Sequence, residues 1–340
     1  MTVKELAESI NVSRATVYRV ISNHPYVKDD VRKKVLEAIE KYDCVPNKMG
    51  KALALRKKDL KITVIVKDRT DSFYADICTG IYNAFSVIMD SGIEIEIKET
   101  FSTSPQLEQK ILEDVKNSNT SAVVICFPQS DDIVRTVNEL VESGKQVITY
   151  STDLVGSKRL FFVGQDDFKS GRIVGQLLDK MLSPNAEIAI CSGLLQNECH
   201  KKRVQGIASY ITEKCKEMKI IEMPDNNNSD ELAYHQTQEM LKHHPDISSL
   251  IVISRGINGI IKALREVNLQ KKVKVVAFDM IPENKMYQRE DIVDVIINQE
   301  PIKQGEWIIE ILYDYLANDV IPENKVNHTQ TQIVLKEMID

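Results

Sequence analysis

Polar side chains close to the N-terminus have the chemistry needed to hydrogen-bond to nucleic acid. Ser13 and Thr16 carry hydroxyl groups, and Arg14 and Arg19 carry guanidinium groups, all in one short stretch. A guanidinium donates two parallel hydrogen bonds to the O6 and N7 atoms of guanine, whereas hydroxyl groups suit phosphate oxygens. Whether these groups can reach a duplex depends on the secondary structure that carries them.

Residues 3–23 have the pattern of two short helices joined by a tight turn. Apolar residues recur at helical spacing, Asn11 and Val12 interrupt the pattern, and Ser13 is a suitable N-cap for a second helix. A helix-turn-helix places the start of its second helix in the major groove; an ordinary helical hairpin with solvated arginines is the alternative. The stripes expected to be buried are Val3, Leu6, Ala7, Ile10, Val17, Val20 and Ile21, with Arg14, Ala15, Tyr18 and Arg19 facing outward.

The charge of the chain is unevenly distributed. Residues 1–58 contain 13 Lys and Arg against 7 Asp and Glu, a net charge of +6, and the remaining 282 residues contain 31 against 43, a net charge of −12. An acidic surface is repelled by a polyanion, so only the N-terminal part is expected to meet DNA.

The rest of the composition points to a soluble, reducing environment. The six cysteines have no C-x-x-C spacing and lie mostly in apolar segments, which predicts reduced, buried thiols. There is no N-terminal signal-like apolar segment and no apolar run of membrane-spanning length. We therefore expect a cytoplasmic protein without a membrane partner.

A third helix and a linker follow the helix-turn-helix. Val31–Tyr42 has an apolar stripe, and Asp29 and Asp30 favour the N-terminus of that helix. The basic segment Asn47–Arg56 is too short to hold a helix alone and is interpreted as a hinge that folds on DNA, with a plain basic linker as the alternative. The expected boundaries are 1–45 for an all-α DNA-binding domain and 46–59 for the hinge.

From Ile62 onward, short β-branched strands alternate with amphipathic helices. Two such series predict an α/β body, residues 60–340, with two lobes built on parallel sheets. The N-lobe is expected at about 60–162 and 294–320, and the C-lobe at about 163–293 and 321–340. Small ligands bind at the carboxyl ends of parallel strands, so a site between the lobes is expected.

From end to end the chain resembles the LacI/GalR type (lactose/galactose repressor) of bacterial transcriptional regulator. The head carries VKELAESINVSRATVYRVISN and YVKDDVRKKVLEAIEKY, followed by a Pro-Asn start to the hinge. The body carries FFVGQDDFKSGRIVGQLL, KKRVQGIASYI, VKVVAFDMIP and VIINQEPIKQG. The resemblance implies a two-lobed, periplasmic-binding-protein-like (type I) fold behind a helix-turn-helix.

The resemblance also implies roles in DNA binding. Arg14 and Ala15 match positions that read base edges, and Arg19 matches a further base or phosphate contact. Ser13, Thr16 and Asn23 match phosphate contacts, and Tyr18 stands where a serine is usual. In the hinge, Leu53 matches a leucine that wedges between base steps, while Gly50-Lys51 departs from the usual Ala-Arg or Ala-Gln; Lys51 is expected to contact phosphate.

In the body, the resemblance implies a set of ligand contacts. Asp279 is expected to accept hydrogen bonds from sugar hydroxyls, Arg203 to reach hydroxyls or a carboxylate, and Gln299 to cross between the lobes. For Phe73 and Tyr74, the alternative to ligand contact is packing in the core. For Arg203, the alternative is a position on the surface. The full set of ligand contacts is Asp71, Phe73, Tyr74, Arg203, Asp279 and Gln299.

Two departures from the family pattern bear on the ligand. Ser151-Thr152 replaces the usual Asp-Arg, with Asp153 one residue later, and SRGINGI replaces the usual Asn-Asp before a helix, which leaves Arg255 and Asn258 without an assigned role. Arg203 together with Arg255 suggests an acidic sugar.

These observations predict a DNA-binding regulator, most simply a repressor, controlled by a sugar or sugar derivative. Operator symmetry implies a homodimer. The alternative is a cytoplasmic or exported sugar-binding protein without operator binding. No nucleotide-binding, zinc-protease or nucleophile-elbow motif is present, and the histidines lack metal-ligand spacing, so no catalytic residue, metal or cofactor is expected.

Overall fold

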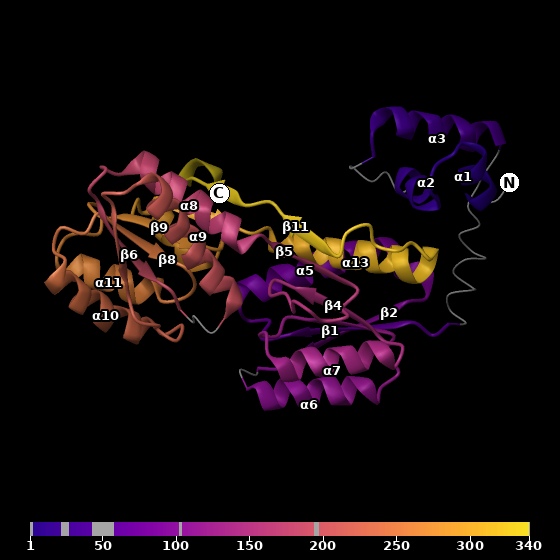
Figure 1. Ribbon diagram of the computed structural model, residues 1–340, viewed down its shortest axis with the longest axis horizontal. Helices are drawn as coiled ribbons and strands as arrows, with labels where there is room; N and C mark the ends of the chain where they lie inside the picture. The colour runs from indigo at the N-terminus through magenta and orange to yellow at the C-terminus, as the bar shows by residue number, and fades with distance from the viewer. Residues whose placement is uncertain (1–2, 22–26, 43–57, 102–103, 194–196, 340) are drawn as a thin grey trace.

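The computed structural model describes residues 3–21, 27–42, 58–101, 104–193 and 197–339. It has a small helical head and an elongated body of two lobes (Figure 1). Most of the predicted hinge, with Lys51 and Leu53, and the predicted phosphate contact Asn23 lie outside the described residues.

The head consists of helices α1 (Val3–Ser9), α2 (Arg14–Ile21) and α3 (Asp29–Tyr42). Leu6, Val17 and Val35 are fully buried at its centre, as expected from the apolar stripes. Asn11 has a φ of +51°, a left-handed conformation that asparagine tolerates better than most residues, and this allows the tight turn between α1 and α2. The predicted helix-turn-helix is therefore present.

The first lobe contains a six-stranded parallel sheet with the order β11-β5-β4-β3-β1-β2. The sheet is filled by β-branched residues; Val64, for example, lies opposite Ile97 on one side and Val124 on the other. The α5–α13 pair covers one face and the α6–α7 pair the other (Figure 1). The strands are β1 (Lys61–Val66), β2 (Glu94–Glu99), β3 (Ala122–Ile125), β4 (Gln146–Tyr150), β5 (Phe161–Gln165) and β11 (Val326–Thr329), and the helices are α5 (Ser72–Ile88), α6 (Pro105–Lys116), α7 (Asp131–Glu142) and α13 (Pro301–Asn318), with the short helix η1 (Met89–Ser91).

The second lobe repeats this plan with the strand order β12-β10-β9-β8-β6-β7. Its strands are parallel except for β12, which runs antiparallel to β10. Helices α8 and α9 pack together on one side, and α10 and α11 on the other (Figure 1). The strands are β6 (Glu187–Cys191), β7 (Lys219–Glu222), β8 (Ser249–Val252), β9 (Lys274–Phe278), β10 (Val295–Asn298) and β12 (Gln332–Val334), and the helices are α8 (Asp167–Met181), α9 (Glu198–Lys214), α10 (Asp230–His243), α11 (Ile257–Glu266), α12 (Pro282–Arg289) and η2 (Lys336–Met338).

Glycines allow the closest helix pairs to form. A Cβ atom on Gly80 of α5 would overlap the carbonyl group of Ile302 in α13, and a Cβ on Gly171 of α8 would overlap the backbone of Arg203 in α9. These helix pairs therefore approach at backbone distance. In the α8–α9 pair, this contact fixes the position of Arg203 along the axis of α8.

The predicted boundaries between the two lobes are partly wrong. Strand β5 and all of β11 belong to the first sheet, whereas β10 belongs to the second, so the segments 163–165, 294–298 and 326–329 were assigned to the wrong lobes. The alternation of strands and helices predicts each element but does not say which sheet edge a strand joins. Here β5 pairs with β4, and β10 pairs with β9.

Candidate functional site

The start of α2 is organised by a local hydrogen bond. The Ser13 hydroxyl accepts a hydrogen bond from the backbone N–H of Thr16 at 3.0 Å, and the two hydroxyl oxygens of these residues are 2.8 Å apart. This is the predicted N-cap. Ser13 and Arg14 are exposed, so a hydroxyl group, a guanidinium and the positive end of a helix dipole face solvent together.

The other end of α2 approaches the first lobe. Arg19 Nη1 donates a hydrogen bond to Glu323 Oε1 at 2.9 Å, and Tyr18 and Arg19 are half-buried rather than fully outward-facing. Both side chains of the ion pair retain contact with solvent, at 26% and 64% exposure, so the pair contributes little to stability. Ala15 lies in α2 as expected, and its side chain is outside the described atoms.

Asp71 links the two lobes. It caps α5, with Oδ1 accepting a hydrogen bond from the Phe73 N–H at 2.9 Å. Its second oxygen, Oδ2, accepts a short hydrogen bond from Arg255 Nη2, in the loop before α11 of the second lobe. The family resemblance placed Asp71 in the cleft, but the sequence did not predict its pairing with Arg255, because 184 residues separate the partners.

Phe73 and Tyr74 form an aromatic pair on the first lobe. Their ring centroids are 5.3 Å apart with an edge-to-face arrangement, and both pack against the apolar core of that lobe. Burial raises the pKa of Tyr74 well above its usual value, and the neighbouring Cys126 and Tyr150 add to this rise. Phe73 and Tyr74 therefore pack in the first lobe, which was the alternative considered for them.

Arg203 is a buried residue, and the surface position considered for it is wrong. It is 2% exposed, and its Nε donates a hydrogen bond to Asp167 Oδ1 at 2.9 Å. Its guanidinium carbon lies 4.5 Å from the centroid of the Phe278 ring, a cation–π contact. Burial raises the pKa of Asp167 to about 6, and the charge of Arg203 opposes this rise.

Asp279 and Gln299 are brought together at the ends of β9 and β10. Gln299 Nε2 donates a hydrogen bond to Asp279 Oδ1 at 2.7 Å. Asp279 has a φ of +73°, and Asn284 secures this turn by donating a hydrogen bond to the Asp279 carbonyl oxygen at 2.9 Å. Burial raises the pKa of the Asp279 carboxyl, while Arg203 and the hydrogen bond from Gln299 lower it.

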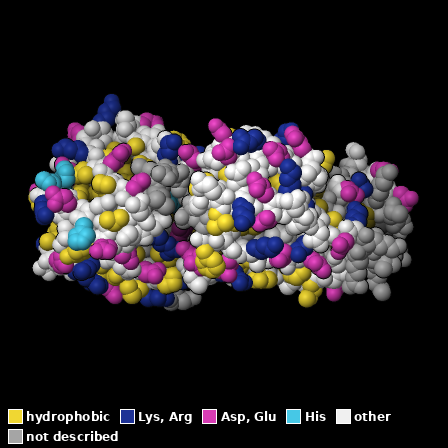
Figure 2. All heavy atoms as spheres, turned by 90° about the horizontal axis from the view of Figure 1, so that it is seen from below, with side chains coloured by type: hydrophobic (Ala, Val, Ile, Leu, Met, Phe, Trp, Pro, Cys, Tyr) yellow, Lys and Arg dark blue, Asp and Glu magenta, His cyan; other side chains and the backbone are white. Residues whose placement is uncertain are grey.

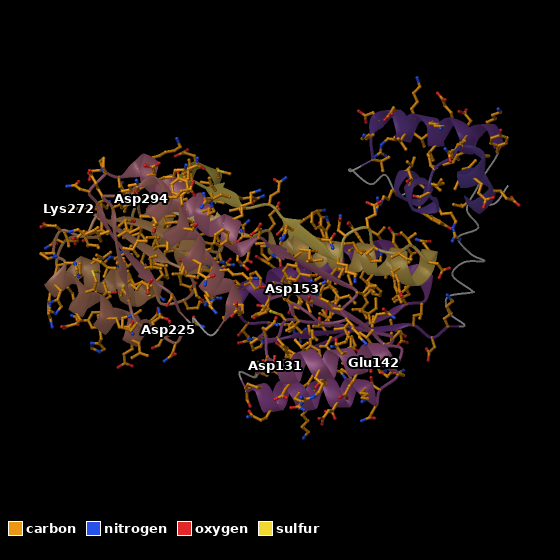
Figure 3. All side chains as sticks on the ribbon, viewed as in Figure 1. Asp131, Glu142, Asp153, Asp225, Lys272 and Asp294 are labelled. Carbon is orange, nitrogen blue, oxygen red and sulfur yellow. The ribbon has the colours of Figure 1, made fainter. Side chains whose placement is uncertain are left out.

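A cavity of about 280 Å³ lies between the lobes, and none of the six predicted ligand residues lines it; Asp167, the partner of Arg203, is its link to that set. Asp153 lies at its edge, on the side of the first lobe that faces the second (Figure 3), and accepts hydrogen bonds from Arg159, one of them 2.6 Å long. Gln165 is 2% exposed, and neither its amide oxygen nor its amide nitrogen has a hydrogen-bond partner. Sequence reasoning missed Gln165 because nothing local marks a buried amide at a strand end. The cavity is lined by Thr152, Asp153, Phe162, Gln165, Asp166, Asp167, Phe168, Glu198, Cys199, Lys202, Val326 and His328.

Both arginines of the cleft are paired with carboxylates of the protein. Arg203 is paired with Asp167 and Arg255 with Asp71, whereas the Asp279 carboxylate accepts from a neutral amide. Such a set of acceptors favours a neutral ligand with hydroxyl donors. It argues against the acidic sugar suggested by two arginines, because neither guanidinium lacks a carboxylate.

The described residues contain neither a candidate metal site nor a membrane-spanning helix. No group of three or more His, Cys, Asp or Glu side chains among them is placed to hold a metal ion. No helix within the described part of the chain is long and apolar enough to cross a membrane. Acidic and basic side chains are interspersed over both lobes, with an indentation where the lobes meet (Figure 2).

A helix-turn-helix head on a two-lobed α/β body with a polar interlobe site defines the class of a ligand-responsive DNA-binding protein. Residues 62–319 match the family "Periplasmic binding protein domain", and residues 2–47 match "Bacterial regulatory proteins, lacI family". The chain therefore belongs to the periplasmic binding protein domain family and, with its lacI-type head, is a LacI-family transcriptional regulator. This family is not enzymatic, which confirms the expectation from the missing catalytic motifs.

Relatives match the whole chain. The "HTH-type transcriptional regulator MalR" of Clostridium butyricum is 24% identical, over 99% of this chain and 98% of its own length. The "Ribose operon repressor" of Lactococcus lactis is 22% identical, over 96% of this chain and 94% of its own length. Among solved structures, the glucose-galactose binding protein GanP from Geobacillus stearothermophilus has a TM-score of 0.75 at 20% identity, covering 82% of this chain and 98% of its own, which shows the same fold for the body.

Proposed function

We propose that this protein is a repressor that binds a two-fold symmetric operator as a homodimer and responds to a neutral sugar or sugar derivative held between its lobes. The proposal rests on two features of one chain. Helix α2 is capped by Ser13 and exposes the guanidinium of Arg14, and the body has polar residues, Asp279 and Gln299, hydrogen-bonded at the strand ends. Operator binding in turn implies a cytoplasmic location.

On the operator, Arg14 and Ala15 read base edges from the start of α2, and Arg19 exchanges Glu323 for a base or phosphate. Two observations support this assignment. Arg14 is exposed, and the ion pair of Arg19 with Glu323 is solvated and weak, so Arg19 can leave Glu323 at little cost in free energy. Ser13, Thr16, Tyr18 and Asn23 contact phosphates and fix register. In the hinge, Lys51 contacts phosphate and Leu53 wedges into the minor groove.

In the cleft, Asp279 and Gln299 form the centre of the effector site, with Asp71 at the boundary between the lobes. Their hydrogen-bonding groups suit sugar hydroxyls, and the Phe73 and Tyr74 rings offer faces for the apolar side of a sugar ring. Arg203 supports the site from behind, because it is buried and already bound to Asp167.

A homodimer is supported by the outer surface of the first lobe. Tyr82 and Val87 of α5 and the adjacent Met89 are 51%, 84% and 61% exposed, respectively. Apolar side chains gathered on one helix are commonly covered by a partner. A two-fold axis would also place two heads on successive half-sites of one duplex.

Selection of bound fragments from the protein's own genomic DNA tests the proposal. The full-length chain is expected to enrich a palindromic sequence, and Arg14→Ala is expected to lose that enrichment. Sedimentation velocity on the same preparation should give a dimer. If no duplex is enriched, with or without a panel of neutral sugars, while sugars still stabilise the protein against heat, the chain is a sugar-binding protein and the proposal is wrong.

A further inference from the structure

The ion pair between Asp71 and Arg255 joins the lobes away from the segments where the chain crosses between them. Asp71 lies at the start of α5 in the first lobe, and Arg255 lies just before α11 in the second. The crossings fall instead after β5, after β10 and after β11. A contact at this position resists separation of the lobes directly.

Both ends of the pair are held by their own lobes. The Asp71 carboxylate is fixed by the hydrogen bond from the Phe73 N–H. On the other side, the carbonyl oxygen of Arg255 accepts a hydrogen bond at 2.8 Å from Asn226, a fully buried residue. Gly256, with a φ of +109°, allows the backbone to turn directly after Arg255. The fixed Asp71 carboxylate and the fixed Arg255 backbone lower the entropy lost on pairing, a loss that usually cancels most of the gain from an exposed ion pair.

The charge of a second-lobe lysine also reaches α5 across the same boundary. Burial raises the pKa of the Asp76 carboxyl on α5, and the Lys285 ammonium group on α12 of the second lobe opposes this rise. Of the Asp71 and Asp76 carboxyl groups, only that of Asp71, the N-cap of α5, forms an ion pair with a described residue of the other lobe. The two side chains of the Asp71–Arg255 pair are 27% and 30% exposed, so water screens them only in part.

We propose that Asp71 and Arg255 form a latch that restrains opening of the lobes in the absence of effector. A ligand that takes hydrogen bonds from Arg255 or gives them to Asp71 competes with the latch directly. The restraint on the lobes is a property of the body alone. Its influence on effector response rests on the proposed function.

A native thiol reports opening without added labels. Cys199, near the start of α9, lines the interlobe cavity together with Thr152 and Phe162 of the first lobe. Cys199 is only 7% exposed and burial raises its pKa, and both slow its alkylation while the lobes are together. Cys215, directly after the other end of α9, is similarly buried but lies outside that cavity and serves as an internal reference.

The test is the rate of alkylation of each thiol by iodoacetamide in the full-length protein, followed by mass spectrometry. Asp71→Asn, which retains an oxygen to cap α5, and Arg255→Gln are each expected to speed alkylation of Cys199 by about three- to tenfold relative to Cys215, the range for a partly buried ion pair. The double variant should add little further. Arg265→Gln is the matched control, because it removes an ion pair with Glu290 inside the second lobe and should leave the ratio unchanged.

Salt gives a second readout. At 1 M NaCl, where the Debye length is about 3 Å, the wild-type ratio should rise toward that of Arg255→Gln, and the variant should change little. An unchanged ratio in both single variants, or equal acceleration of Cys199 and Cys215, would overturn the latch. Faster Cys199 alkylation in a protein that binds no duplex would support the latch and refute the proposed function; operator binding with unchanged thiol rates would do the reverse.

Discussion

The head and the cleft place their polar groups in opposite ways. In the head, Ser13 and Thr16 are three residues apart, and the side chains available for DNA stay in contact with water. In the cleft, Arg203 meets Asp167 across 36 residues, and Arg255 meets Asp71 across 184. Local sequence therefore determines the chemistry of the head, whereas the fold of the body determines that of the cleft. We therefore expect substitutions of the polar residues in the head to change DNA binding with little effect on stability. Substitutions of the paired residues in the cleft should change both effector binding and stability.

The largest effect on stability is expected at Arg203. Arg203→Ala leaves the Asp167 carboxylate buried without its partner, which should lower the free energy of unfolding by about 3 to 5 kcal/mol. Urea unfolding of the full-length protein measures this change. Arg172→Ala, which removes a partly exposed ion pair with Glu213 on the same helix pair, should cost at most about 1 kcal/mol. Equal losses of unfolding free energy in the two variants would show that burial of the Arg203–Asp167 pair does not affect stability.

The next effect concerns DNA and should leave stability unchanged. Arg14→Ala should cost about 1 to 3 kcal/mol of sequence discrimination per half-site, because a bidentate contact to guanine is lost. Lys51→Ala should instead weaken binding to all duplexes similarly, because a phosphate contact is lost. Fluorescence anisotropy with the selected operator and a scrambled duplex measures both. A constant ratio of the two affinities in Arg14→Ala would contradict the assignment.

A third prediction concerns Glu108, an isolated buried carboxyl in the first lobe. Glu108 is 1% exposed, neither carboxylate oxygen has a hydrogen-bond partner, and burial raises its pKa to about 7. Because the pKa is higher in the folded state, the folded protein holds the proton more tightly, and stability falls as the pH rises from the ordinary value of 4.5 through 7. Glu108→Gln should remove this fall and stabilise the protein by about 1 to 3 kcal/mol at pH 8 but not at pH 5. Parallel stability curves for the two proteins between pH 5 and pH 8 would count against a buried, unpaired carboxylate.

The same contrast explains how much could be predicted from the sequence. The Ser13 cap and the buried Val17 follow from spacing within one or two helical turns. The meeting of Asp279 and Gln299 follows from the rule that parallel strands end at one edge of a sheet, combined with the family resemblance. The end of β5 and all of β10 and β11 were assigned to the wrong lobes, because alternation of elements does not encode sheet order.

Pairs that depend on the relative placement of the lobes could not be predicted. The pairing of Arg255 with Asp71 was not predicted, because the two residues lie on different lobes. The orphaned amide of Gln165 is visible only once β5 is known to end beside α8 and α9, at the interlobe cavity.

The coupling between cleft and operator is tested most directly by measuring operator affinity against a panel of neutral sugars. The account predicts that at least one sugar changes the affinity of the full-length protein by about 5- to 150-fold, the usual range of allosteric coupling. In Asp279→Asn the response to that sugar should be lost while operator binding without sugar is retained. A sugar that binds the protein with no effect on operator affinity, or an Asp279→Asn variant that responds like the wild type, would contradict the account.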